Sequence, residues 1–131
     1  RGGGYLLHTA SAAGLLNQIG AAPYAVSKHA SVGLAEWLAL SHGDQGIKVS
    51  VLCPQAVATA MTANGPGTAG VDGMISAEVV ARACVQAIRE ETFLILPHAE
   101  VGDYMKKKTA DYDRWIGGMR KLNRRFADHE L

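Results

Sequence analysis

Cysteine, proline and aromatic residues are scarce in this sequence. It has two cysteines and four prolines in 131 residues, and aromatic side chains make up 6%. Cys53 lies in an apolar run and Cys84 in a helical pattern, so reduced, buried thiols fit better than a disulfide framework, and a cytoplasmic location is favoured. No metal site is expected, because the histidines lack the short spacings of zinc ligands. They are His8, His29, His42, His98 and His129.

An excess of charge of one sign is also missing. Lys and Arg number 13 against 12 Asp and Glu, for a formal net charge of +1. This balance provides no positive field for nucleic acid. No stretch approaches the roughly 20 apolar residues that a membrane span needs. We therefore expect a soluble domain that binds a small molecule, with no nucleic-acid partner and no membrane span.

Runs of apolar and β-branched residues alternate with helical patterns along the chain. Strands are predicted at Tyr5–Thr9, Ile47–Cys53 and Phe93–Leu96. A long helix from Pro23 to about His42 joins the first two, and a helix capped by Ser76 precedes the third. Strands alternating with helices are typical of parallel βαβ units. The fold class predicted is α/β, a Rossmann-like doubly wound parallel sheet.

The long helix and the C-terminal tail both carry apolar residues at helical spacing. In the tail, Trp115, Met119, Leu122 and Phe126 predict a helix that docks on its own domain, one of two helices expected after Pro97. On the long helix the predicted apolar face consists of Val26, Ala30, Gly33, Leu34, Trp37, Leu38 and Ser41. Small residues such as Ala25, Val32 and Ala39 leave room for close approach of another helix.

The sequence does not begin with the strand, G-x-G-x-x-G turn and helix that bind phosphate at the start of a dinucleotide-binding fold, and Gly2–Gly4 does not replace that turn. We therefore expect the C-terminal half of such a sheet, in a chain that starts in the middle of a longer one. Residues 1–97 are assigned to the catalytic half of the domain and residues 98–131 to its helical tail. The Tyr5–Thr9 edge should then be covered by a second copy, by an upstream segment or by the tail.

Tyr24 and Lys28 are four residues apart near the start of the long helix, so both side chains lie on one face. An ammonium group nearby favours the ionised form of a phenol, so the pair can exchange a proton near neutral pH. Ser11 follows the first strand, at the edge where open α/β sheets bind ligands. The three side chains are expected to converge, although such a pair is common on solvated helices.

A set of motif residues follows in order along the chain: Ser11, Gly14, the run Pro23–Ala30 and the segment Pro54–Thr59. In these residues the chain resembles the classical short-chain dehydrogenase/reductase family, from Tyr5 to about Pro97. The resemblance implies hydride transfer between NAD or NADP and an alcohol or carbonyl carbon. Tyr24 would be the general acid or base, Lys28 would assist it and bind the nicotinamide ribose, and Ser11 would hold the substrate oxygen.

The resemblance also implies binding residues outside this catalytic set. Pro54, Gln55, Val57 and Thr59 would lie beside the nicotinamide, with Gln55 standing where the family usually has glycine. Apolar walls are expected from Leu15, Leu16 and Ile19, and the glycine-rich loop over residues 62–73 is expected to close over the substrate. The substrate-binding residues assigned are Ser11, Ala13, Leu15 and Met61.

Two alternatives to this oxidoreductase remain open from the sequence. One is an epimerase or dehydratase of the extended branch of the superfamily, although the short tail after Pro97 speaks against it. The other is a non-catalytic fragment that packs with a partner, which the missing phosphate-binding turn favours and the retained Ser11, Tyr24 and Lys28 oppose. The resemblance implies a homodimer or homotetramer formed through the long helix.

Overall fold

The computed structural model describes residues 2–59, 70 and 72–127. Within this part the chain forms three strands and five α-helices, with one short 3₁₀ turn after α2. Their bounds are β1 (Gly4–Thr9), α1 (Ala13–Leu16), α2 (Ala22–His42), β2 (Ile47–Leu52), α3 (Ala77–Glu90), β3 (Leu94–Ile95), α4 (Glu100–Ala110) and α5 (Tyr112–Ala127).

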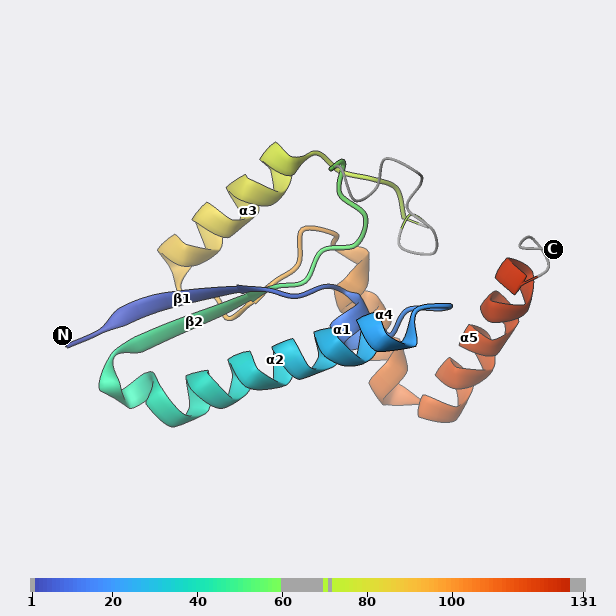
Figure 1. Cartoon of the computed structure of the whole chain (residues 1–131), viewed down its shortest axis with the longest axis horizontal. Helices are drawn as coiled ribbons and strands as arrows, with labels where there is room; N and C mark the ends of the chain where they lie inside the picture. Colours follow the sequence, from blue (N-terminus) through green and yellow to red (C-terminus); the bar gives the residue numbers. More distant parts are fainter. Residues whose placement is uncertain (1, 60–69, 71, 128–131) are drawn as a thin grey trace.

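The strands form one parallel sheet in the order β1-β2-β3. In its register Leu7 lies opposite Ser50 and Val51 lies opposite Leu94. Figure 1 shows α2 along one face of this sheet and α3 along the other. The α/β fold class and the parallel sheet predicted from the sequence are therefore confirmed. The third strand is shorter than expected, with two residues instead of four.

The hydrophobic core lies between the sheet and α2. Val49, Val51 and Cys53 point from β2 and its end toward Val32 and Ala35 of α2. A smaller cluster on the opposite face joins Leu52 and Ile95 to Ala87 of α3. Successive side chains of β2 contribute to the two clusters in turn, so α2 and α3 both bury apolar side chains against this strand.

The buried face of α2 differs from the predicted one. Val26 and Trp37 are 69% and 57% exposed, and only Leu38 of the predicted large residues packs against the core. Ala25 and Val32 are buried instead. Because α2 is apolar on nearly every side, the spacing of its large residues does not show which face turns inward, and here the helix approaches the chain through its small residues.

The closest approach to α2 comes from α1. A Cβ atom on Gly14 would lie 2.6 Å from the carbonyl oxygen of Lys28 and 3.0 Å from Cγ2 of Val32. Only glycine fits at this distance without movement of the α2 backbone. The space beside Val32 therefore accommodates α1, so the predicted close approach of another helix is made within the same chain.

The tail forms two helices, as predicted. Val101 of α4 is fully buried against Ala12 and Leu16, with Tyr104 and Trp115 packed beside it. The ammonium of Lys108 donates to the carbonyl of Leu15 over 2.7 Å, which attaches α4 to the end of α1. No helix in the described part of the chain is long and apolar enough to cross a membrane. The assignment of residues 98–131 to the same domain stays a prediction.

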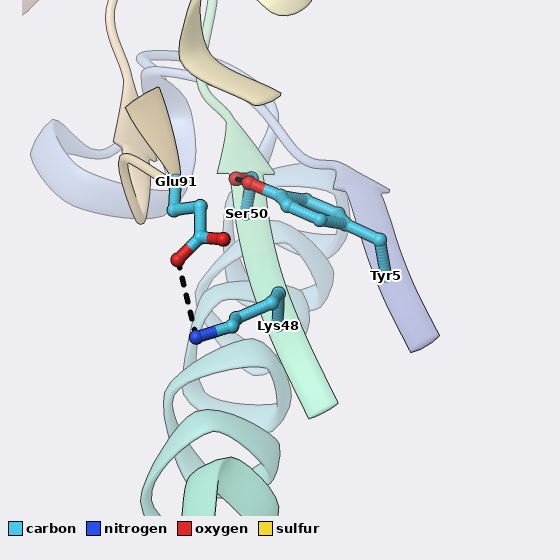
Figure 2. Close-up of polar contacts among 4 residues, drawn as sticks. All are labelled: Tyr5, Lys48, Ser50 and Glu91. Carbon is cyan, nitrogen blue, oxygen red and sulfur yellow. Dashed lines mark hydrogen bonds and ion pairs between the residues drawn. The ribbon is translucent and has the colours of Figure 1, made fainter. Parts of the chain in front are cut away.

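The edge strand β1 is bound to β2 by side chains as well as by backbone. Figure 2 shows Tyr5 reaching Ser50, on the same side as the Lys48–Glu91 ion pair. Ser50 donates its only hydroxyl hydrogen to the carbonyl of Thr92 over 2.6 Å, so Tyr5 must donate to Ser50, also over 2.6 Å. No described segment pairs with the outer edge of β1, so the tail does not provide the expected cover.

We expect Gly14→Ala to lower the free energy of unfolding by about 1–3 kcal/mol, because the new methyl group would press on the α2 backbone. Gly33→Ala, on the open side of α2, should raise it by up to about 1 kcal/mol through helix propensity. Denaturant titration of both variants in the full chain checks this pair. Equal effects at the two glycines would contradict the close approach.

Tyr5→Phe should lower the free energy of unfolding by about 1 kcal/mol, since it removes the hydroxyl that donates to buried Ser50. Tyr112→Phe, on the exposed side of α5, is the matched control and should change it by less than about 0.5 kcal/mol. Thermal unfolding of the two variants is the measurement. If both melt like the parent chain, the Tyr5 hydroxyl does not stabilise the edge strand.

Candidate functional site

Ser11 lies at the carboxyl end of β1, where the chain turns into α1. It is only 8% exposed, and its Oγ accepts a hydrogen bond from the backbone N–H of Ala13 over 3.1 Å. The N–H of Ala12 donates to the carbonyl of Pro54 over 2.9 Å. This bond joins the Ser11 turn to the segment that follows β2, so the carboxyl ends of the two strands form one edge of the site.

Tyr24 and Lys28 lie in the first two turns of α2, which begins with Pro23 near its N-terminus. The Lys28 ammonium lies 5.5 Å from the centroid of the Tyr24 ring. The predicted shared face is therefore observed, and the phenol is 38% exposed. The contact of Gly14 with the Lys28 carbonyl places α1, and with it the Ser11 turn, directly against this part of α2.

The segment after β2 contains the four residues assigned to the cofactor. Val57 forms a parallel bridge with Ile75, made by the N–H of Ala58 and the carbonyl of Ala56. Thr59 is exposed. Gln55 has no positive φ, so a side chain at this usual glycine position causes no left-handed strain. Pro54 ties this segment to the Ser11 turn, because its carbonyl accepts a hydrogen bond from the Ala12 N–H.

A cavity of about 260 Å³ opens beside Ser11. Of the four residues assigned to the substrate, Ser11 and Ala13 line it. Leu15 does not, because its side chain packs into the core clusters between α1, α2 and α4. Met61 lies outside the described residues, as does most of the predicted lid. Leu16 and Ile19, expected as apolar walls, both line the cavity.

Part of the cavity wall comes from residues that the sequence did not assign to the site. α5 contributes Trp115, Met119 and Leu122, the stripe expected only to dock the helix. Asp72 and Tyr104 also line the wall. Helical spacing in the sequence indicated the apolar stripe of α5. Nothing in the sequence indicated that Asp72, at the end of the glycine-rich loop, would contact Tyr104 of α4.

Four polar side chains form a continuous network at this wall. Tyr104 donates to Oδ1 of Asp72 over 2.7 Å, and Nε2 of Gln55 donates to Oδ2 over 3.0 Å. The backbone N–H of Gln55 donates to Nδ1 of buried His98 over 3.1 Å. The hydrogen bond to Asp72 and burial raise the pKa of Tyr104 to about 12, so this phenol remains a neutral donor at ordinary pH.

Cys53 lies beneath the Ser11 turn but does not have the properties of a nucleophile. It is fully buried, and burial raises the pKa of its thiol to about 11, although a hydrogen bond with the Ser11 backbone lowers it in part. Thiols react as thiolates, so this side chain packs and does not react. Among the described residues, no group of three or more His, Cys, Asp or Glu side chains is placed to hold a metal ion.

Comparison with known proteins gives a consistent family. The family model described as "short chain dehydrogenase" matches residues 1–68. The chain is 37% identical over 114 residues to 1-deoxy-11-beta-hydroxypentalenate dehydrogenase of Streptomyces exfoliatus, covering 86% of this chain and 42% of the relative. It is 41% identical over 63 residues to meso-2,3-butanediol dehydrogenase of Serratia marcescens, covering 48% and 25% respectively.

Solved structures show the same fold. A short-chain dehydrogenase from Sphingobium yanoikuyae in complex with NADPH superposes with a TM-score of 0.67 at 19% identity, over 92% of this chain and 45% of that one. The chain thus spans less than half the length of these relatives. With more than half of its residues matched by the family model, the chain belongs to the short-chain dehydrogenase family.

Proposed function

We propose that the chain is the catalytic part of an NAD(P)-dependent oxidoreductase that interconverts an alcohol and a ketone or aldehyde. The observation that carries this proposal is the Tyr24–Lys28 pair, with the ammonium 5.5 Å from the ring centroid, on a helix held against the Ser11 turn. A chain of this family that retains all three residue types in this order has the groups needed for proton transfer.

Each of the three side chains has a separate role in this proposal. The Tyr24 hydroxyl gives a proton to the substrate oxygen in reduction and takes it back in oxidation. Lys28 supplies positive charge beside that phenol and binds the ribose hydroxyls of the cofactor. Ser11, whose buried Oγ already accepts from Ala13, donates its own hydrogen to the substrate oxygen as negative charge develops there.

NAD or NADP would supply or accept the hydride. The residues present fit such a group, because Pro54 and the Ser11 turn are joined by a hydrogen bond and the segment from Gln55 to Thr59 continues along the same edge. Gln55 is tied back to His98 and Asp72, so its side chain does not extend freely over this edge. We assign cofactor contacts to Tyr24, Lys28, Pro54, Gln55, Val57 and Thr59.

The substrate would be a small alcohol or carbonyl compound with an apolar body. Most of the cavity wall is apolar, with Leu16, Ile19 and the α5 stripe among its residues. The relatives' names, a hydroxypentalenate dehydrogenase and a butanediol dehydrogenase, agree with an alcohol as the reacting group. The proposed substrate residues remain Ser11, Ala13, Leu15 and Met61. Leu15 packs behind the lining residues, so it would influence the substrate only through them.

A homodimer or homotetramer also remains a proposal. Val32 lies against Gly14 of α1 and Ala25 is 1% exposed, so neither side chain offers surface to a second copy. The exposed apolar surface of α2 includes Val26, Leu34, Trp37 and Leu40. A cytoplasmic location is part of the same proposal.

Tyr24→Phe should lower kcat by about 10²–10⁴-fold, because the variant keeps the ring beneath Lys28 and removes only the transferable proton. Tyr112→Phe, on exposed α5, should stay within twofold of the parent. Turnover of a ketone with NADPH or NADH, together with circular dichroism, checks both. A Tyr24→Phe variant that is folded and active would refute the catalytic assignment.

Lys28→Ala should weaken both cofactor binding and turnover, each by about tenfold or more, because one ammonium group serves the phenol and the ribose. Lys48→Ala removes the same charge from β2, where Lys48 pairs with exposed Glu91 on the α3 side of the sheet (Figure 2). That control should leave cofactor affinity unchanged. NADPH fluorescence titration measures the cofactor affinity of both variants. If the two affinities are equal, Lys28 does not bind the cofactor.

A further inference from the structure

The cavity beside Ser11 has one charged side chain among its described lining residues. That residue is Asp72, at the end of the segment between β2 and α3. Around it the wall is largely apolar, with Trp115, Met119 and Leu122 from α5. A carboxylate at an apolar wall interacts more strongly with a ligand than one in water, because the local dielectric is lower.

The partners of Asp72 leave its negative charge uncompensated. Oδ1 accepts from the Tyr104 hydroxyl and Oδ2 accepts from the Gln55 amide, and both donors are neutral. In the part of the chain that the structure describes, no lysine, arginine or histidine forms an ion pair with it. The wall therefore presents a fixed negative charge to whatever fills the cavity.

The same hydrogen bonds show what Asp72 can still accept. A carboxylate has about four lone-pair sites, of which Tyr104 and Gln55 occupy two. Two sites remain, which is enough to accept a hydrogen bond from a further hydroxyl donor. A buried ammonium group would need three acceptors, and a ligand carboxylate would meet a like charge, which costs several kcal/mol.

We propose that Asp72 determines the substrate class of this site. The cavity takes a ketone or alcohol that carries a second hydroxyl group, which donates to Asp72 while the reacting oxygen lies at Ser11, and it disfavours a substrate whose carboxylate would lie at that same position beside Asp72. Asp72 is a specificity-determining residue, and Tyr104 and Gln55 hold its carboxylate in place. The statement about the reacting oxygen rests on the proposed oxidoreductase function.

Three probes that share one ring and one carbonyl test this assignment. They are 4-hydroxycyclohexanone, 4-methylcyclohexanone and 4-oxocyclohexanecarboxylate. The sequence has two tryptophans, Trp37 and Trp115, and only Trp115 lines the cavity. In a Trp37→Phe background of the full chain, Trp115 fluorescence reports probe binding without requiring turnover. We expect the hydroxyl probe to bind more tightly than the methyl probe, and the carboxylate probe to bind least tightly.

Asp72→Asn removes the charge and keeps a side chain of the same shape. It should raise affinity for the carboxylate probe about tenfold or more relative to the methyl probe. Asp103→Asn removes the same charge from the exposed side of α4 and should leave all three affinities within twofold. Equal ratios in the Asp72 and Asp103 variants would overturn the proposal.

Probe binding to the chain that keeps Asp72 is a second test, and it does not depend on whether an Asp72 variant folds. If the Trp37→Phe chain binds the carboxylate probe as tightly as the methyl probe, the assignment of Asp72 is wrong. Turnover with NADPH and NADH separates this proposal from the proposed function. Probes that bind in the expected order but are not reduced would refute hydride transfer and leave the role of Asp72 intact, whereas reduction without discrimination among the probes would refute only the role of Asp72.

Discussion

The contact between Gly14 and the carbonyl of Lys28 is the constraint on which the arrangement of the site depends. It brings the backbone of α1 to the backbone of α2 with no side chain between them. Ser11 is three residues before Gly14 in the chain, and Tyr24 is one turn before Lys28, so one contact between backbones sets the relative position of both. Side-chain packing alone would leave more freedom, because side chains can change rotamer where backbones cannot.

The part of the cavity wall around Asp72 is held together by polar contacts across long sequence separations. Gln55, Asp72, His98 and Tyr104 come from four different segments, yet each makes a hydrogen bond to another of the group. Such bonds are strengthened by their partly buried setting, and each member constrains the next. The glutamine in place of the usual glycine is therefore part of the wall and not a defect of the segment.

The sequence predicted the elements of the fold and the family better than the details of the cavity. Short apolar and β-branched runs, Pro23 and the Ser76 cap placed the strands and helices, because these signals are local. The inward face of α2 was predicted incorrectly, since its small residues carry little periodic signal. Asp72 and Tyr104 were not predicted to lie together, because their contact depends on the path of a loop. Leu15 was placed in the wall, whereas the turn of α1 directs it into the core.

The two hydrogen bonds of Gln55 have a consequence for how ligands influence each other. Its backbone belongs to the segment proposed to carry the nicotinamide, and its amide group holds Asp72 in the substrate wall. A ligand that shifts one end of this residue changes the free energy of binding at the other. Such coupling is reciprocal by thermodynamic necessity. Under the proposed site assignments, cofactor occupancy and substrate preference would be linked through Gln55, and a substrate's affinity would have a defined value only when the state of the cofactor site is specified.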